Sequence, residues 1–463
     1  MRSQSISKPT TRLIEATALT MIGVIAILGF LSVAAATQVR QGQDPLPALP
    51  GALVPAGLIA GLLAGFHLFL RVRGMRSEQI IWPAVSLLSV VGAVMLWRLG
   101  GSDSVFQQLG RGLFPGVVVA GLLVAKPQRI EAVRRWAPII GLVGLMLPVV
   151  TALFGVGDET GARLALKLGP LPAIQTSEPI KLAMIIFLAW YVAEQGRAAE
   201  GRAWPVLGWM RIPALRYFVP GVLFVAVATL ALVSMSDYGA VLILGAIFVA
   251  MLYAGFDTRV FVTIAAIGLG LAVITGLILS LTWEVPVVIR YRFLAFLNPW
   301  STAMIAPNGQ PTGITIAEGP GYQIQQAIYA VIAGGVIGRG LGFGSPDYVP
   351  LAHSDFILAA ILEEFGAIIG VAILFLFAVL LLRIFRLVAL LPAGQIFERL
   401  LLVGIGAHLF TQVFVMAGGT LNLLPVTGVT IPFLSQGGVA LLINLAEVGI
   451  VLALTRRREG LRQ

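Results

Sequence analysis

The residues most able to do chemistry in this chain stand in a short stretch, VPLAHSDFILAAILEEFG, at positions 349–366. His353, Ser354 and Asp355 come where a long hydrophobic run begins. Asp355 could be the N-cap of the helix that starts there, because aspartate is favoured at that position and is stabilised by the helix dipole. A carboxylate at the membrane surface could instead act as a general base. The spacing alone leaves both roles open.

Two more carboxylates of the stretch, Glu363 and Glu364, lie about 12 Å further along the same expected helix. Ionisable groups within membrane-spanning segments are rare, and they are usually paired or functional. Neither glutamate has a basic neighbour in the sequence, so each must find a partner, a water molecule or a proton inside a helix bundle. We therefore expect both to belong to packing or polar networks and not to the chemistry.

A second group of polar residues stands in GPLPAIQTSEPIKLAMIIF, positions 169–187. Glu178 and Lys181 are three residues apart, which places them on one face of a helix that begins at about Ser177. They could neutralise each other and so ease the burial of both charges. Alternatively, Lys181 and Gln175 could face a polar cavity that opens to the outer side of the membrane.

A third group is basic. Arg290 and Arg292 lie two residues apart among apolar residues in VVIRYRFLAFLNPW, positions 287–300, as in a short amphipathic segment on the outer leaflet. The planar guanidinium group of arginine binds phosphate oxygens in pairs, so both are candidates for binding a diphosphate. The alternative is that their long side chains only reach from the apolar layer to the interface.

Two further features carry weaker signals. Asp237, in VSMSDYGAVL, is expected to be a cap or turn residue that helps to shape a cavity. The glycine-rich stretch GYQIQQAIYAVIAGGVIGRGLGFG, positions 321–344, lacks the strand–turn–helix context that nucleotide-binding loops need. It predicts a tight, close-packed turn structure, and its Arg339 is a weaker candidate for binding an anion.

The amino-acid composition indicates which kind of secondary structure positions these residues. The chain has 463 residues, of which 58% are hydrophobic and only 11% are charged, whereas soluble domains carry about a quarter charged residues. Long apolar runs predict an all-α, polytopic membrane helix bundle with about twelve transmembrane helices. The runs lie near 13–36, 51–70, 80–97, 112–125, 137–156, 178–195, 214–235, 238–256, 259–282, 356–382, 400–417 and 429–454.

The distribution of the basic residues indicates the topology. Most of the 31 lysines and arginines fall in alternate connecting segments if the N-terminus is cytoplasmic, which is the positive-inside pattern. Both termini are therefore expected in the cytoplasm of a multi-pass protein of the cytoplasmic membrane. The net charge of +10 then reflects topology and attraction to anionic membrane lipids, and a nucleic-acid partner is excluded.

The same topology divides the chain into segments. They are a cytoplasmic tail (1–12), N-terminal transmembrane helices (13–136), the first part of a transmembrane core (137–282), a large extracytoplasmic loop (283–355), the C-terminal part of the core (356–455) and a basic cytoplasmic tail (456–463). The chain has no cysteine, and its three histidines lie far apart. No metal site is therefore predicted and no cofactor is required, although a divalent cation (Mg²⁺ or Mn²⁺) could assist at a diphosphate.

Several blocks resemble, in their order, the shape, elongation, division and sporulation (SEDS) family, which contains the RodA and FtsW proteins. The blocks are GARLALKLGPLPAIQTSEPIKLA, SMSDYGA, IRYRFLAFLNP, GPGYQIQQAIYAVIAGGVIGRGLGFG, VPLAHSDFILAAILEEFG and GGTLNLLPVTGVTIPFLSQGG. They extend from about residue 161 to 450, roughly two thirds of the chain. The N-terminal extension and the block SEQIIWPAVSLLSVVGAVMLWRLG are more similar to RodA-like members than to FtsW.

The resemblance implies a fold and an activity. The family has a core of about ten spanning helices, to which two N-terminal helices are added here. Its members polymerise lipid II into the β-1,4 glycan strands of peptidoglycan, release undecaprenyl pyrophosphate, and act with a class B penicillin-binding protein that supplies transpeptidation. The implied role is in cell-wall elongation, although the sequence does not separate elongation from division.

The resemblance also assigns roles to residues. The essential carboxylate of the family corresponds to Asp355, which we expect to be the base for the 4-hydroxyl of the acceptor sugar in an inverting transfer. The candidates for binding lipid II and the nascent glycan are Arg290, Arg292, Lys181, Gln175, Glu178, Arg339, His353 and Ser354. The residues expected to shape the cavity are Asp237, Glu363 and Glu364.

The chain departs from the family pattern near these blocks. Leu351 stands where an acidic residue is usual, Ala165 replaces a tryptophan, and the last block carries Gln436 and Val439. The departures at Leu351 and Ala165 keep open a non-catalytic scaffold for a transpeptidase. Two further alternatives are a transporter that flips a lipid-linked oligosaccharide and a related membrane glycosyltransferase such as an O-antigen ligase. A transporter would place its charges near the middle of the bilayer, within inverted repeats that this sequence does not show.

Overall fold

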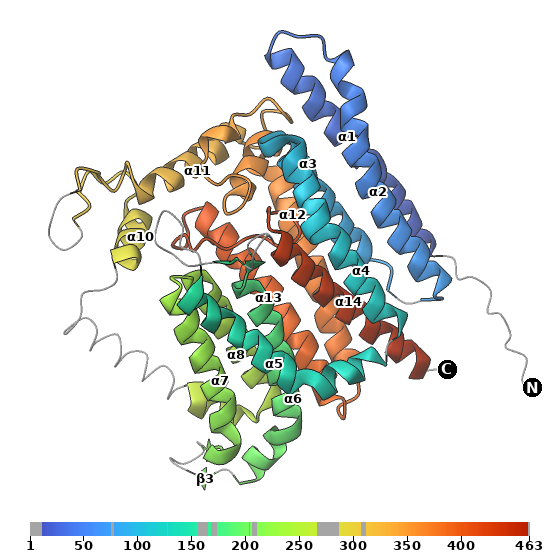
Figure 1. The fold of residues 1–463 in the computed structure, drawn as a ribbon, viewed down its shortest axis with the longest axis vertical. Coiled ribbons are helices and arrows are strands. Elements are labelled where there is room, and N and C mark those ends of the chain that lie inside the picture. The colour runs from blue at the N-terminus through green and yellow to red at the C-terminus, as the bar shows by residue number, and fades with distance from the viewer. Residues whose placement is uncertain are drawn as a thin grey trace, which may run out of the picture. The chain divides into compact units, whose positions relative to one another are not determined.

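The computed structural model is almost entirely helical, as the apolar runs predicted (Figure 1). It describes residues 12–75, 78–126, 128–155, 165–167, 174–202, 204–205, 211–265, 287–306 and 312–461. The packing divides the chain into two compact units, each assembled from segments that are far apart in the sequence. The first unit contains residues 1–132, 330–389 and 430–463, and the second contains residues 133–329 and 390–429.

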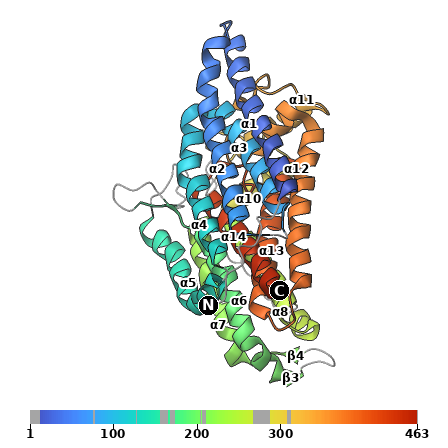
Figure 2. The ribbon, with the colours of Figure 1, turned by 90° about the vertical axis from the view of Figure 1, so that its right-hand side faces the viewer.

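The first unit is built from long helices. Its helices are α1 (Leu13–Arg40), α2 (Leu49–Val72), α3 (Ile81–Gln108), α4 (Phe114–Ala125), α12 (Ile357–Leu390) and α14 (Gly438–Leu461), with the short helical turns η1 (Leu46–Ala48), η2 (Leu109–Leu113) and η4 (Pro346–Tyr348). α1 and α2 form a hairpin and lie side by side in Figure 1 and Figure 2. α14 packs against α4, η2 and α3, and it is among the most buried of the long apolar helices.

The second unit has a different set of elements. Its helices are α5 (Arg129–Phe154), α6 (Ser177–Gly201), α7 (Leu215–Ser234), α8 (Tyr238–Gly255), α10 (Val287–Leu297), most of α11 (Pro320–Gly334) and α13 (Ile396–Thr420). Two short antiparallel hairpins pair β1 (Ala165–Leu166) with β2 (Ile174–Gln175), and β3 (Trp204–Pro205) with β4 (Arg211–Ile212). The well-buried α13 packs against α6 and α8, and it forms the centre of this unit.

Within the described residues, nine helical segments are long and apolar enough to cross a membrane. One of them, Ile81–Ala125, contains both the third and the fourth predicted spans, because the chain stays helical through most of their connection and breaks only at Gly101 (φ 66°). α6, the sixth predicted span, is not among the nine, since its charged residues lower its mean hydropathy. The ninth predicted span, 259–282, lies mostly outside the described residues.

The prediction of a tight turn structure over 321–344 is wrong for its first half. Pro320–Gly334 is an α-helix, α11, and turns occupy only the residues from Gly335 onward. Apolar residues recur along α11 at helical spacing, and this periodicity outweighs the glycines that flank it. The sequence predicted one large loop over 283–355, but this segment contains two helices, α10 and α11.

Candidate functional site

The turn at residues 351–356 carries Asp355 and stands directly before α12. Leu351 has a left-handed backbone conformation with φ of 56°, which is uncommon for a bulky residue and marks local strain. Its carbonyl oxygen accepts hydrogen bonds from the backbone N–H of Ser354 at 3.0 Å and of Phe356 at 3.2 Å. These bonds close a tight turn around Asp355, which is half-buried.

By its backbone hydrogen bonds, α12 has its N-cap position at the residue that follows Asp355. The carbonyl oxygen of Phe356 accepts the N–H of Ala360 at 3.3 Å, which is the first intrahelical bond, and α12 begins at Ile357. The N-cap residue is the one whose carbonyl accepts that first bond, here Phe356. Asp355 therefore lies one residue outside the helix, still near the positive end of the helix dipole.

A second segment, the loop at residues 431–437, is hydrogen-bonded to this turn. The hydroxyl of Ser435 donates to the carbonyl oxygen of Ser354 at 2.7 Å, and the backbone N–H of Gln436 donates to the carbonyl oxygen of His353 at 2.9 Å. Ser435 is buried. The two residues that immediately precede Asp355 are therefore both fixed by the loop, which limits where the carboxylate can move.

His353 and Ser354 belong to the same turn as Asp355. Ser354 is half-buried and donates its hydroxyl to the Leu351 carbonyl at 3.4 Å. His353 is an exposed residue, but partial burial of its imidazole lowers the pKa of that side chain from its usual value. The ring is therefore neutral at pH 7 and adds no positive charge beside Asp355.

Glu363 and Glu364 are buried within α12 and accept hydrogen bonds from groups that the local sequence did not reveal. Glu364 forms an ion pair with Arg98 at 2.9 Å and accepts the N–H of Gly342 at 3.0 Å. Glu363 accepts the N–H of Ser345 at 2.8 Å. Buried carboxylates with such partners stabilise a fold, because their loss would leave buried donors unpaired.

The backbone beside these glutamates is interrupted. Gly366, at φ 78°, breaks α12, and the turns after α11 exchange hydrogen bonds with the helix at the break. The N–H of Arg339 donates to the carbonyl oxygen of Glu363 at 2.9 Å, and the Arg339 side chain donates to the carbonyl of Ala333 at 3.3 Å. Arg339 is exposed, and it lies with Glu363 and Glu364 where the turns after α11 are hydrogen-bonded to α12.

In the second unit, Lys181 and Glu178 form a buried ion pair at the start of α6. Their N–O distance is 2.7 Å, and the two residues are 2% and 5% exposed. Within the described residues, the second carboxylate oxygen of Glu178 has no hydrogen-bond partner. Gln175 is half-buried in β2, directly opposite Ala165 in the register of the hairpin. The family's missing tryptophan would therefore stand across from Gln175.

Asp237 is the N-cap residue of α8. Its Oδ1 accepts the backbone N–H of Ala240 at 3.0 Å, which satisfies one of the free donors at the helix start. This is the structural role that the sequence suggested for it, and it explains the aspartate without invoking the chemistry.

Arg290 and Arg292 lie on α10, which packs through Tyr291 and Ala295 against a small apolar cluster. Tyr291 also accepts the N–H of Ala306 at 2.7 Å with its hydroxyl oxygen. Arg290 is exposed, with its guanidinium carbon 6.0 Å from the centre of the Tyr291 ring, and Arg292 is half-buried. The part of the chain that the structure describes offers neither arginine an ion pair.

The structure thus brings Asp355, His353 and Ser354 together in one turn, and Glu178 with Lys181 in one ion pair. Sequence reasoning missed Arg98 and Ser435. Arg98 was assigned to a loop, and Ser435 was only one letter of the block PFLSQGG. Among the described residues, no group of three or more histidines or carboxylates could hold a metal ion.

Comparison with known proteins adds independent information. Residues 78–460 match the family model of the cell cycle proteins FtsW, RodA and SpoVE. The chain is 30% identical over 459 residues to the peptidoglycan glycosyltransferase RodA of Mycobacterium tuberculosis, covering 96% of this chain and 90% of the relative. It is 32% identical over 381 residues to stage V sporulation protein E of Bacillus subtilis, covering 80% of this chain and 94% of that protein.

The fold has a solved counterpart. A chain from the structure of a peptidoglycan synthase complex, which describes the coordination of polymerization and crosslinking, superposes with a TM-score of 0.64. The match covers 82% of this chain and 97% of the other, at 24% sequence identity. At this identity, the similarity supports the fold of a polytopic membrane protein.

Proposed function

This chain belongs to the family of cell cycle proteins that contains FtsW, RodA and SpoVE, and we propose that it polymerises lipid II into the glycan strands of peptidoglycan. Relatives that match 96% and 81% of this chain are named as a peptidoglycan glycosyltransferase and a probable one. The observation that carries a specific mechanism is the constrained turn 351–356, which presents a half-buried carboxylate just before a helix.

The chemistry requires a base and an anion-binding group. The 4-hydroxyl oxygen of the acceptor sugar attacks the anomeric carbon of the donor, and the bond from that carbon to the diphosphate breaks. The hydroxyl proton passes to the carboxylate of Asp355, and undecaprenyl diphosphate leaves with the bonding electron pair. Displacement from the opposite face converts an α-linked donor into a β-linked strand. General base catalysis of this kind contributes about 10²- to 10⁴-fold to a rate.

The basic residues that could bind the diphosphate differ in their solvent exposure and in whether they are already paired. Arg290 is exposed and Arg292 is half-buried, so both can approach the diphosphate of a lipid. Lys181 is nearly inaccessible and already paired with Glu178, so its charge is largely balanced before any substrate arrives. We therefore assign the diphosphate first to the two arginines of α10, with Lys181 and Arg339 in secondary roles.

A divalent cation would be bound mainly by the substrate. The described residues contain no cluster of carboxylates or histidines to hold one, whereas a diphosphate offers oxygen ligands of the type that Mg²⁺ prefers. Mg²⁺ or Mn²⁺ would then neutralise part of the charge that develops on the leaving group, alongside the arginines.

The setting follows from topology and from the relatives. The positive-inside distribution of lysine and arginine supports a multi-pass protein of the bacterial cytoplasmic membrane with both termini in the cytoplasm. The similarity to a chain of a peptidoglycan synthase complex supports a class B penicillin-binding protein as the partner that crosslinks the strands. The turn with Asp355 would then face the outer side, where lipid II presents its sugars.

The test is polymerisation of labelled lipid II by the full-length protein in liposomes, with and without a class B penicillin-binding protein from the same genome. Asp355→Ala should abolish glycan strands, and Asp103→Asn, at an exposed aspartate of α3, should leave them unchanged. Arg290→Ala and Arg292→Ala should raise the KM for lipid II. Strands made by Asp355→Ala at the wild-type rate would refute the base, and a wild-type protein without activity in every condition would indicate a scaffold.

A further inference from the structure

We propose that Gln108 is a positioning residue for Asp355, which acts through the loop at residues 431–437. The inference rests on the proposed role of Asp355 as the base. Gln108 is the last residue of α3, and it is followed directly by the π-helical turn η2. Such turns are rare in proteins and are frequent at functional sites.

Both ends of the Gln108 amide are bound to the backbone of the loop. Nε2 donates to the carbonyl oxygen of Ser435 at 3.0 Å, and Oε1 accepts the N–H of Gly437 at 3.0 Å. Gln108 is only 7% exposed, so water does not readily replace either bond. One side chain therefore holds two backbone groups two residues apart, and its loss would leave the carbonyl of the buried Ser435 without this donor.

The loop passes this restraint to the turn with Asp355. Ser435, whose carbonyl is held by Gln108, donates its hydroxyl to the Ser354 carbonyl at 2.7 Å. Gln436, between the two backbone groups bound by Gln108, donates its N–H to the His353 carbonyl at 2.9 Å. A continuous set of hydrogen bonds thus runs from the end of α3 to both residues that precede Asp355.

Close packing against α3 also limits the movement of the loop. A Cβ atom at Gly92 of α3 would lie 2.5 Å from the carbonyl oxygen of Leu434, so the backbones of α3 and the loop are in direct contact. Phe433 has a left-handed φ of 65°, as Leu351 does in the turn. Each of the two hydrogen-bonded segments therefore contains one bulky residue in a strained conformation, a feature that clusters at active sites.

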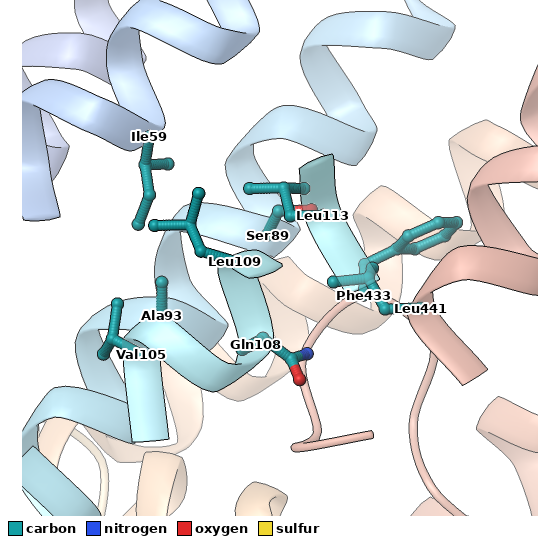
Figure 3. A pocket seen from close by; sticks show the side chains of 9 residues that line it. All are labelled: Ile59, Ser89, Ala93, Val105, Gln108, Leu109, Leu113, Phe433 and Leu441. Carbon is teal, nitrogen blue, oxygen red and sulfur yellow. The ribbon is translucent and has the colours of Figure 1, made fainter. Parts of the chain in front are cut away.

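A substitution of Ser89, which lines a small cavity together with Gln108, provides a matched control. Figure 3 shows Gln108 among its lining side chains, with Ser89 and Phe433. Ser89 is 5% exposed, and its hydroxyl has no hydrogen-bond partner within the described part of the chain. Ser89→Ala therefore changes the packing of the same cavity without removing a hydrogen bond to the loop or the turn.

The experiment measures lipid II polymerisation by full-length variants in liposomes, together with their melting temperatures. Gln108→Met keeps the length of the side chain but removes both hydrogen bonds, and Ser435→Ala removes the bond to Ser354. Because a displacement of about 1 Å can cost 10²-fold in rate, each should lower kcat by about 10- to 100-fold. KM for lipid II should stay near the wild-type value, and Ser89→Ala should behave as wild type.

Two further measurements separate positioning from stability. The double variant Gln108→Met with Ser435→Ala should lose less activity than the product of the two single losses, because both variants loosen the same loop. Hydrogen exchange at the amides of Ser354, Phe356 and Gln436 should speed up in Gln108→Met and not in Ser89→Ala. Independent, multiplicative losses in the double variant would overturn the shared path.

The remaining outcomes are also decisive. A wild-type kcat in Gln108→Met, while Asp355→Ala is inactive, would refute this inference and leave the proposed base intact. A raised KM with unchanged kcat, or a rate that falls only with the folded fraction, would refute it as well. If Asp355→Ala remained active, the proposed base would fail, and unchanged exchange at Ser354 and Phe356 would then refute the coupling separately.

Discussion

The carboxylates of the stretch 349–366 have opposite environments although they stand within ten residues of one another. Asp355 is half-buried in a turn that is tied down through backbone hydrogen bonds. Glu364 is 1% exposed, and its oxygens are taken up by Arg98 and by the N–H of Gly342. The first arrangement leaves a fixed carboxylate within reach of a substrate, and the second uses the carboxylate to join segments of the fold.

This comparison teaches what separates a reactive carboxylate from a structural one in an apolar segment. Both are acidic side chains in the same short, largely apolar stretch of the sequence. The two residues differ in how deeply they are buried and in the backbone around them. At Asp355 the neighbouring carbonyls of His353 and Ser354 are held, whereas at Glu364 the side chain is the partner.

The largest expected effect is that a substitution at Asp355 lowers the rate and not the stability, whereas a substitution at Glu364 lowers the stability and not the rate. Asp355→Asn should reduce kcat by about 10²-fold or more, because an amide cannot accept the proton, while the melting temperature stays near wild type. Glu364→Gln should lower the melting temperature and leave the rate of the folded fraction unchanged. Lipid II polymerisation and thermal unfolding, measured on the same samples, check both. If Glu364→Gln abolished turnover in a fully folded protein, the division into reactive and structural carboxylates would be wrong.

The next effect concerns the partner of Glu364. Arg98→Leu leaves a buried carboxylate without its ion pair and should destabilise the protein by about 3 kcal/mol, seen as a lower melting temperature. Asp347→Asn removes only the exposed partner of Arg98, which lies at 3.3 Å, and exposed pairs contribute about 1 kcal/mol or less. Equal melting temperatures for the two variants would show that the buried ion pair contributes no more to stability than the exposed one.

Much of the fold could be predicted from the sequence, because apolar runs are local signals. The run at 13–36 became α1, and the run at 400–417 lies within α13. The partners of the site residues could not be predicted in this way. Arg98 and Glu364 are 266 residues apart, and Gln108 and Ser435 are 327 apart. Such pairs depend on how helices pack, and no period or spacing in the sequence encodes them.

The turn itself shows the same limit. Asp355 was recognised from the block HSDFI, but the strain at Leu351 was not, because a leucine predicts no left-handed backbone. The spacing also did not give the start of the helix, which the backbone hydrogen bonds place so that Phe356 holds the N-cap position. Helix boundaries are the least secure part of any sequence-based assignment.

A smaller effect is expected at Leu351. Asparagine tolerates the left-handed conformation better than leucine, which costs about 1 kcal/mol there. Leu351→Asn should therefore raise the melting temperature slightly, and thermal unfolding checks it. Leu423→Asn, at another exposed leucine without positive φ, should give no such gain. A melting temperature that falls in Leu351→Asn as much as in Leu423→Asn would show that the turn is not strained.

The smallest effect tests the titratable group beside Asp355. The folded pKa of His353 is lowered from 6.5 by burial, so below this value the unfolded chain binds more protons than the folded one. Stability that is fully present above pH 6.5 is therefore lost as the pH falls through the folded pKa. His353→Gln cannot take up the proton, so its melting temperature should decline less than that of the wild type as the pH is lowered from about 7 to 5.

The carboxylate of Glu318 provides the control for this pH window. Hydrogen bonds from the backbone and side chain of Thr315 lower the pKa of Glu318 from 4.5, so its contribution is lost only as the pH falls below that value. Glu318→Gln should therefore leave the melting curve between about pH 7 and pH 5 unchanged. If Glu318→Gln flattened that curve as much as His353→Gln, the acid sensitivity would be a general effect of charge and not a property of the turn that holds Asp355.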